Sequence, residues 1–551
     1  MLDEMFLRKE VEPYIDNLYL QFSLLKRHRD TAAVHVLRVF DELNSSAEMT
    51  PFGTVNRRLK QNARFRWSHE ALPWALRWVW SDCPATGFAS LDFQQELFAE
   101  AQQLMDLSSK YYELCRCFVL YSQGLFTVET IREQKRVKFS YRSSLEERRD
   151  ASAFVYSSLQ DRPPLPPRVQ GLIYETSPII HAIFPHYITK TGEMSVQFEV
   201  PHDMMEYFKR WASVLVGEMR FDMPGTSNLG EFTLDDFKAF WKGVFALCVA
   251  QIYAHAVADE AVGTKRGAIG SLIMQETEES LSRAKALFPV SDKSWHSIVE
   301  TLVYAPSKKY WDPFWQPIIR ISDGTMLISP HLIAVSSPQR NLLTLVSQSK
   351  GGRAVYDRIS IQKEEDQLQG LTKIFRTYHT RTKVPVRRVD GTMLTDIDLL
   401  VFDRESGELL FVHAKSFRRP DTVQEVMAKD KEIQAALSIA VRAEVRVVEL
   451  GTSWASSVLG IRIIRDPKIF SIVVSRDFIP SGWVCDARVP AADSEFVTRF
   501  IASTQFKGLA SLYNACKCFY EDFEMKHPVK RAESEIQFGE YVFNIPSIEL
   551  T

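Results

Sequence analysis

The N-terminal part of the chain alternates apolar and polar residues with a helical period. Residues 93–120 carry apolar side chains three and four positions apart, which is the spacing of one buried helix face. This pattern predicts a mostly helical N-terminal domain over residues 1–160. The run Arg-Pro-Pro-Leu-Pro-Pro-Arg at 162–168 predicts a loop or linker, because proline cannot donate the backbone hydrogen bond that a helix interior needs.

A helical and mixed middle region is predicted for residues 171–310. Thr233, followed closely by two acidic residues, is typical of a helix start, because its hydroxyl can cap backbone amides. The acids face the positive end of the helix dipole. The richly apolar stretch 237–255 then predicts a buried helix, and 276–287 predicts another helix.

Residues 311–350 are predicted to connect this region to the next through one hairpin and one helix. Two short apolar runs, 318–321 and 326–328, flank the sequence Ser-Asp-Gly-Thr. Asp-Gly between apolar runs favours a β-hairpin. A helix is expected at 339–347.

Helix and strand patterns alternate in residues 351–480, and this order predicts an α/β domain of mixed α+β character. A helix leads into three strands that are joined by short polar turns, which predicts an antiparallel meander. A second helix and further strands follow, and residues 481–551 are predicted to be a C-terminal extension. The expected elements are a helix at 355–378, strands at 384–389, 396–402 and 409–415, a helix at 421–441, and strands at 445–450 and 470–475.

Composition places the chain among ordinary globular proteins. Of its 551 residues, 45% are hydrophobic and 25% are charged, which excludes a disordered or collagen-like chain. The formal net charge of −2 does not indicate a general electrostatic attraction to nucleic acid or to an anionic membrane. Local basic patches remain open.

Three features of the sequence predict a cytoplasmic protein that does not associate with a membrane. The longest apolar run, 245–258, is interrupted by Gln and His and is too short for a spanning helix. The first residues, Met-Leu-Asp-Glu, lack the basic-then-apolar order of a signal peptide. The seven cysteines contain no CxxC pair, so neither a disulfide framework nor a structural zinc site is indicated.

Polar side chains gather at one end of the otherwise apolar predicted meander. Successive residues of a strand point to opposite faces, so His413 and Lys415 share one face of the third strand. The second and third strands are antiparallel neighbours, which places Asp398 beside both residues. Burying unpaired charge is unfavourable, so this group indicates either a functional site or a buried Asp–Lys ion pair.

This layout resembles the PD-(D/E)xK nuclease superfamily, which has the restriction-endonuclease-like fold. Its pattern is an Asp on one strand, acid-x-Lys on the next, and often a Glu from the preceding helix. By this resemblance Asp398 matches the metal-binding Asp, with Asp396 a less favoured register, and Lys415 matches the lysine. Either Glu364 or Glu365 matches the helix glutamate. The residues that carry the resemblance are TDIDLLV at 395–401 and FVHAK at 411–415.

His413 departs from the family pattern, because it stands where the acid of acid-x-Lys is expected. In one interpretation its imidazole binds or orients a metal ion together with Asp398 and Glu365, which favours Mn²⁺ over Mg²⁺. In the other interpretation the site is degenerate, and the domain binds nucleic acid or a protein partner without cleaving anything.

The resemblance implies metal-dependent hydrolysis of phosphodiester bonds, with DNA favoured over RNA, and a role in restriction or anti-phage defence. Asp398, with Glu364 or Glu365, would hold Mg²⁺ or Mn²⁺, which lowers the pKa of the attacking water. Lys415 would orient that water or offset charge that develops at phosphorus. Four arginines flank the motif and form either a contact surface for phosphates or an ordinary solvated surface: Arg387, Arg388, Arg418 and Arg419.

The main alternative is a catalytically degenerate protein whose nuclease-like domain acts as a scaffold for nucleic acid or for a partner. His413 is the residue that separates these two hypotheses. The sequence contains no GxxxxGK[ST] phosphate loop, so ATP hydrolysis by this chain is not expected. The sequence leaves a protein partner and a homo-oligomer open.

Overall fold

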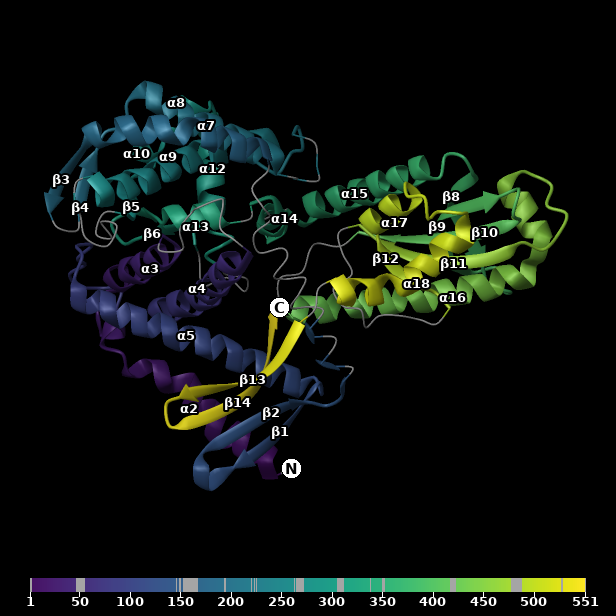
Figure 1. Ribbon diagram of the computed structural model, residues 1–551, viewed down its shortest axis with the longest axis horizontal. Coiled ribbons are helices and arrows are strands. Elements are labelled where there is room, and N and C mark those ends of the chain that lie inside the picture. The colour runs from purple at the N-terminus through teal and green to yellow at the C-terminus, as the bar shows by residue number, and fades with distance from the viewer. Residues whose placement is uncertain are drawn as a thin grey trace. The chain divides into compact units, whose positions relative to one another are not determined.

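The computed structural model (Figure 1) divides into two compact units. The first unit comprises residues 1–140, 161–356 and 534–545, and the second comprises 141–160, 357–533 and 546–551. The structure describes residues 2–45, 55–144, 146–147, 150–151, 167–192, 195–219, 221, 223, 225–261, 263, 272–304, 312–336, 338–348, 352–416, 423–476, 488–526 and 529–550. Arg418, Arg419 and residues 162–166 of the predicted linker lie outside these ranges.

Three long helices form most of the described N-terminal part of the first unit. α5 (Gln95–Ser122) confirms the helix predicted over 93–120, and it packs against α3 (Arg29–Ser45) and α4 (Val55–Asp82). The buried face of α5 has the expected helical spacing. Short helical segments precede α3: α1 (Leu2–Phe6), η1 (Leu7–Val11), α2 (Glu12–Asn17), η2 (Leu18–Gln21) and η3 (Ser23–Lys26).

α3 is buried along most of its length, although it carries polar side chains. Asp41 has no exposed surface, and its Oδ1 accepts hydrogen bonds from the Ser329 hydroxyl (2.9 Å) and the His331 backbone amide (3.0 Å). Donors of this kind offset part of the cost of burying the carboxylate, whose other oxygen, Oδ2, has no hydrogen-bond partner. These bonds therefore fix α3 against the start of α13 (Pro330–Val335).

The middle region is organised around α9 (Leu234–Ala261), which confirms the buried helix predicted over 237–255. The predicted cap is also confirmed. The Thr233 hydroxyl accepts from the Asp236 amide (3.2 Å), and the Asp236 carboxylate accepts from the Thr233 amide (2.9 Å). By length and composition α9 could cross a membrane, but 72% of its apolar window is buried inside the protein, as in a core helix.

The single helix predicted over 276–287 is wrong. The chain instead forms β5 (Met274–Glu276) and two helical turns, α10 (Glu278–Leu281) and α11 (Ala284–Leu287). The reason is local, because Thr277 has an extended backbone and its hydroxyl caps α10. The cap separates the strand from the helical turns.

The predicted hairpin and the helix after it are confirmed. β6 (Ile318–Arg320) and β7 (Met326–Ile328) are antiparallel, and β5 pairs with the other side of β7. Gly324 has the positive φ (88°) that this tight connection requires. α14 (Pro338–Gln348) follows.

Strands that are distant in the sequence build one sheet of the first unit, in the order β1-β2-β14-β13. β14 runs parallel to β2, so residues 534–545 of the predicted C-terminal extension belong to the first unit. The remaining elements are β1 (Phe126–Ile131), η4 (Arg132–Gln134), β2 (Arg136–Tyr141), α7 (Pro167–Ile183), η5 (Phe184–Tyr187), β3 (Ile188–Gly192), β4 (Ser195–Phe198), α8 (His202–Glu218), α12 (Asp292–Leu302), β13 (Val529–Phe538) and β14 (Tyr541–Leu550).

The second unit contains a five-stranded mixed sheet in the order β12-β11-β10-β9-β8 (Figure 1). β8, β9 and β10 form the predicted antiparallel meander, and β10, β11 and β12 are parallel. The elements are α15 (Gly352–Ile374), β8 (His379–Arg387), β9 (Met393–Asp403), β10 (Glu408–Lys415), α16 (Val423–Leu459), β11 (Lys468–Ser475), β12 (Ala491–Asp493), α17 (Ser494–Ile501) and α18 (Leu509–Lys526).

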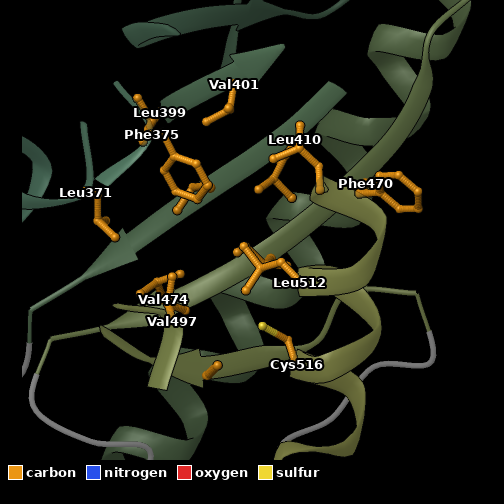
Figure 2. Close-up of a cluster of buried hydrophobic side chains, with 14 of the residues drawn as sticks. Leu371, Phe375, Leu399, Val401, Leu410, Phe470, Val474, Val497, Leu512 and Cys516 are labelled. Atoms are coloured by element: carbon orange, nitrogen blue, oxygen red, sulfur yellow. The ribbon is translucent and has the colours of Figure 1, made fainter. Parts of the chain in front are cut away.

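Helices cover both faces of this sheet. Leu371 of α15 and Phe375, which follows the helix, pack with α17 and α18 on one face, and Figure 2 shows them in one cluster with strand residues such as Leu399 and Val474. α16 covers the opposite face. The mixed α/β class predicted from the sequence is confirmed. The order of helix, three strands, helix and strand is also observed, although the strand after the second helix is β11 and not the one predicted over 445–450.

The strand predicted over 445–450 is wrong, because these residues continue α16. Val445 and Val448 are exposed, whereas Ala440, Ala443 and Val447 are buried at intervals of three and four residues. This spacing places one helical face against the sheet. Packing of that face outweighs the strand preference of the local Val-rich run.

His35 generates a prediction for the first unit. Its Nε2 accepts from the Gln94 backbone amide (3.2 Å), so Nδ1, 2.8 Å from the Thr31 carbonyl, carries the proton. Burial lowers the pKa of His35 from 6.5 to about 4. The pKa of His35 in the folded protein therefore lies below its ordinary value. The contribution of the neutral side chain to the free energy of unfolding is complete above pH 6.5, and it is lost as the pH falls toward 4.

Lowering the pH from 7 to 5 should therefore reduce the free energy of unfolding of the wild type by roughly 2 kcal/mol more than that of His35→Gln, which cannot titrate there. Urea unfolding followed by tryptophan fluorescence at both pH values measures this difference. An equal loss in both proteins would show that His35 is not the titrating group.

Candidate active site

The candidate site lies where β9 and β10 stop pairing. Their regular register ends at the pair Leu399 and Val412. Beyond it, the backbone amide of Ala414 donates to Oδ2 of Asp398 at 2.8 Å. The Asp398 carboxylate therefore satisfies a strand amide at the point where backbone pairing has ended.

The alternation of β9 is interrupted at the same place. Leu399 and Val401 pack against the α15 face of the sheet, whereas Leu400 packs against α16. Strict alternation would place Ile397 with Leu399, but Ile397 packs with Leu400 on the α16 face. The alternation of side chains in β9 thus shifts by one residue at Asp398, so this side chain stands at the break in the apolar pattern.

The charges around Asp398 show which predicted residues are brought together. Burial raises the pKa of Asp398, while the Ala414 amide and the Lys415 charge lower it. The charges of Glu364 and Asp396 raise the same pKa. Lys415 and Glu364 therefore both lie within electrostatic reach of Asp398, although the three residues come from β10, α15 and β9.

Two hydrogen bonds position the stretch of α15 that carries Glu364. The Arg476 guanidinium donates to the Lys363 carbonyl (3.0 Å), and the Gln367 side-chain amide donates to the Val474 carbonyl (3.1 Å). Both hold the helix against the end of β11. Glu364 lies between these two anchoring points in the sequence.

Glu365 is directed to another partner. Its Oε1 lies 3.9 Å from Nζ of Lys383 on β8. The sequence left Glu364 and Glu365 as equal candidates for the helix glutamate. The geometry favours Glu364, because its charge acts on Asp398.

His413 is part of the layer between the sheet and α16. It pairs with Val473, which packs against α16, and it is only 4% exposed. Burial, with a smaller contribution from the Lys415 charge, lowers the pKa of His413 to about 4, so the imidazole is neutral at pH 7. Its buried Nε2 has no hydrogen-bond partner. Asp398, His413 and Glu365 are not gathered into one set of ligands.

Two of the four predicted phosphate-contacting arginines are described, and both are exposed at the β8–β9 hairpin. Arg387 donates to the Gly391 carbonyl (3.0 Å), and Arg388 donates to the Thr392 hydroxyl (3.3 Å). These bonds remain within the hairpin. Both guanidinium groups also face solvent.

The first unit holds a group that the sequence reasoning missed. Glu278, His296 and Glu300 place their ligand atoms within 4.8 Å of one another, and among the described residues this is the one such group that could hold a metal ion. His296 and Glu300 are four residues apart on α12, which was the available signal. Arg320 pairs with Glu300 (2.5 Å), and Glu278 raises the pKa of His296.

Comparisons with protein families, with curated proteins and with solved structures find no match for this chain.

The burial of His413 generates a prediction that separates a core side chain from a metal ligand. A buried polar atom without a partner is destabilising by about 1–3 kcal/mol. In EDTA, His413→Leu should therefore raise the free energy of unfolding by about 1 kcal/mol, as measured in urea. Val473→Ala, in the same layer, is the matched control and should lower it by about 1–3 kcal/mol. A clear loss of stability in His413→Leu would contradict this account.

Proposed function

We propose that the second unit is a metal-dependent nuclease of the PD-(D/E)xK type that acts on DNA. The observation that carries the proposal is the convergence of Asp398, Lys415 and Glu364 from three elements at the end of β9–β10 pairing. The order α15, β8, β9, β10, α16 and β11 supports it, because it is the order that the resemblance implies.

The donor groups fit a hard divalent cation. Asp398 and Glu364 both offer carboxylate oxygens, which Mg²⁺ and Mn²⁺ prefer. Their negative charges also repel each other, since Glu364 raises the pKa of Asp398. When bound, such a cation lowers the pKa of a coordinated water and polarises a phosphate oxygen. In this proposal Asp398 and Glu364 hold the cation.

The other residues orient the reacting groups or offset negative charge. The Ala414 amide fixes one oxygen of Asp398, which leaves its other oxygen available for a cation. Lys415 would orient the attacking water or offset negative charge on the phosphate in the transition state. His413 packs behind the strand and is not part of the proposed ligand set.

A specific observation favours a second candidate function. Because His413 replaces an acid and lies in the core, the site has one carboxylate fewer than the family pattern. In the alternative the unit therefore binds nucleic acid or a protein partner as a scaffold, without hydrolysis. Cleavage that appears only after His413→Glu would favour this alternative.

A cleavage assay tests the proposal on supercoiled, linear and single-stranded DNA and on a matched RNA, with Mg²⁺, Mn²⁺ or EDTA. Asp398→Asn keeps an oxygen that can accept from the Ala414 amide but removes the charge, and it should lower the rate by about 100-fold or more. Lys415→Ala should lose a similar factor. Asp396→Asn is the matched control and should retain most of the activity.

Metal-dependent cutting of DNA that both site variants abolish would support the nuclease and the placement of its site. Cutting that survives Asp398→Asn but not Asp396→Asn would move the site to the other register. Cutting that survives all three substitutions would rule the site out. Preferential cutting of RNA would replace DNA as the proposed substrate.

A further inference from the structure

Lys383 has an unusual backbone conformation for its position. Its φ is +52° within β8, although it is not a glycine. Among the described residues the other such case is Lys135, which ends a short 3₁₀ turn. A left-handed conformation is unfavourable for a residue with a Cβ, and strain of this kind concentrates at functional sites.

The strained residue stands opposite Asp398. The flanking pairs are Thr382 with Leu399 and Val384 with Ile397, which leaves Lys383 across from Asp398. The alternation of side chains between the two faces of the sheet also shifts by one residue here in β8, as it does in β9. Arg381 pairs with Leu400 of the α16 face, yet Val384, three residues later, packs on that same face. Two neighbouring strands are therefore kinked at the same position along the sheet. The residues at the kinks are Lys383 in β8 and the proposed metal-binding Asp398 in β9.

The side chain of Lys383 reaches the α15 side of the sheet. Its Nζ lies 3.9 Å from Glu365, next to the helix residue Glu364 whose charge acts on Asp398. Lys383 is 65% exposed, and an ion pair at such exposure contributes little to stability. The pair with Glu365 therefore does not by itself account for the retained strain.

β8 is also the edge strand of the sheet, and its exposed side chains are strongly basic. Pro385 confirms the edge position, because proline cannot donate to a further strand. Arg381, Lys383, Arg387 and Arg388 follow one another along this edge toward the hairpin. A row of cations that includes Lys383, opposite Asp398, suits a phosphate backbone.

We propose that Lys383 is a positioning residue that binds a DNA backbone phosphate beside the one cleaved, and that the kink in β8 holds its ammonium there. The proposal rests on the nuclease function proposed above. In the free protein Glu365 pairs with the ammonium, and the incoming phosphate takes its place. Lys383 thus sets the register of the strand relative to Asp398.

Three substitutions isolate this role. Lys383→Gly suits the positive φ, so it should remove the charge without a loss in melting temperature. Lys383→Arg retains the charge. Glu365→Gln frees the ammonium. DNA binding is measured by fluorescence anisotropy on a short duplex in EDTA, where no cleavage occurs, over a series of salt concentrations.

Lys383→Gly should weaken binding several-fold for every sequence tested. It should also reduce the magnitude of the slope of log K against log [salt] by about 1. Lys383→Arg should restore most of the affinity, and Glu365→Gln should increase it. In cleavage with Mg²⁺ or Mn²⁺, Lys383→Gly should raise KM more than it lowers kcat.

The outcomes separate this inference from the proposed function. If the wild type neither binds nor cuts DNA, both proposals fall. If the wild type binds and cuts, and Lys383→Gly matches it in affinity and salt dependence, only the role of Lys383 falls. A weakened Lys383→Gly that Lys383→Arg does not rescue, with a lower melting temperature, would indicate a structural residue and would also overturn the inference.

Discussion

The hydrogen bond from the Ala414 amide to the Asp398 carboxylate is the interaction on which the proposed site depends. Strands β9 and β10 pair regularly up to Leu399 and Val412 and then stop. A strand amide left without an acceptor is unfavourable, and here a side chain replaces the missing backbone carbonyl. The hydrogen bond that follows the last backbone pair therefore satisfies the strand amide and also fixes the carboxylate.

Several features around this hydrogen bond lower the stability of the second unit. Asp398 is largely removed from solvent and faces the charge of Glu364, and both factors raise its pKa. Lys383, opposite Asp398 on the neighbouring strand β8, has a left-handed backbone, and His413 buries a nitrogen without a partner. Each feature is destabilising alone. They persist because the apolar layers on both faces of the sheet hold the strands in place, and such concentrations of strain and shifted pKa values favour a functional site.

The sequence predicted most elements of the second unit, since its strands are short apolar runs that polar turns separate. It failed at 445–450, where β-branched residues belong to a helix whose buried face depends on the sheet beneath it. It could not choose between Glu364 and Glu365, because adjacent helix residues differ only in direction. It also gave no sign of Lys383, since a positive φ at a lysine follows from a kink shared with the neighbouring strand.

The imidazole at 413 can be understood through the charge balance of the site. An acid there would add a further negative charge near Asp398, whose pKa burial and Glu364 already raise. A neutral imidazole adds none, and its low pKa keeps it neutral at physiological pH. In the proposed nuclease the site would then have fewer oxygen ligands but a smaller repulsion between negative charges to overcome before a cation binds. Cation retention would depend more strongly on Asp398 and Glu364, and the lysines at 415 and 383 would take a larger share in holding the phosphates.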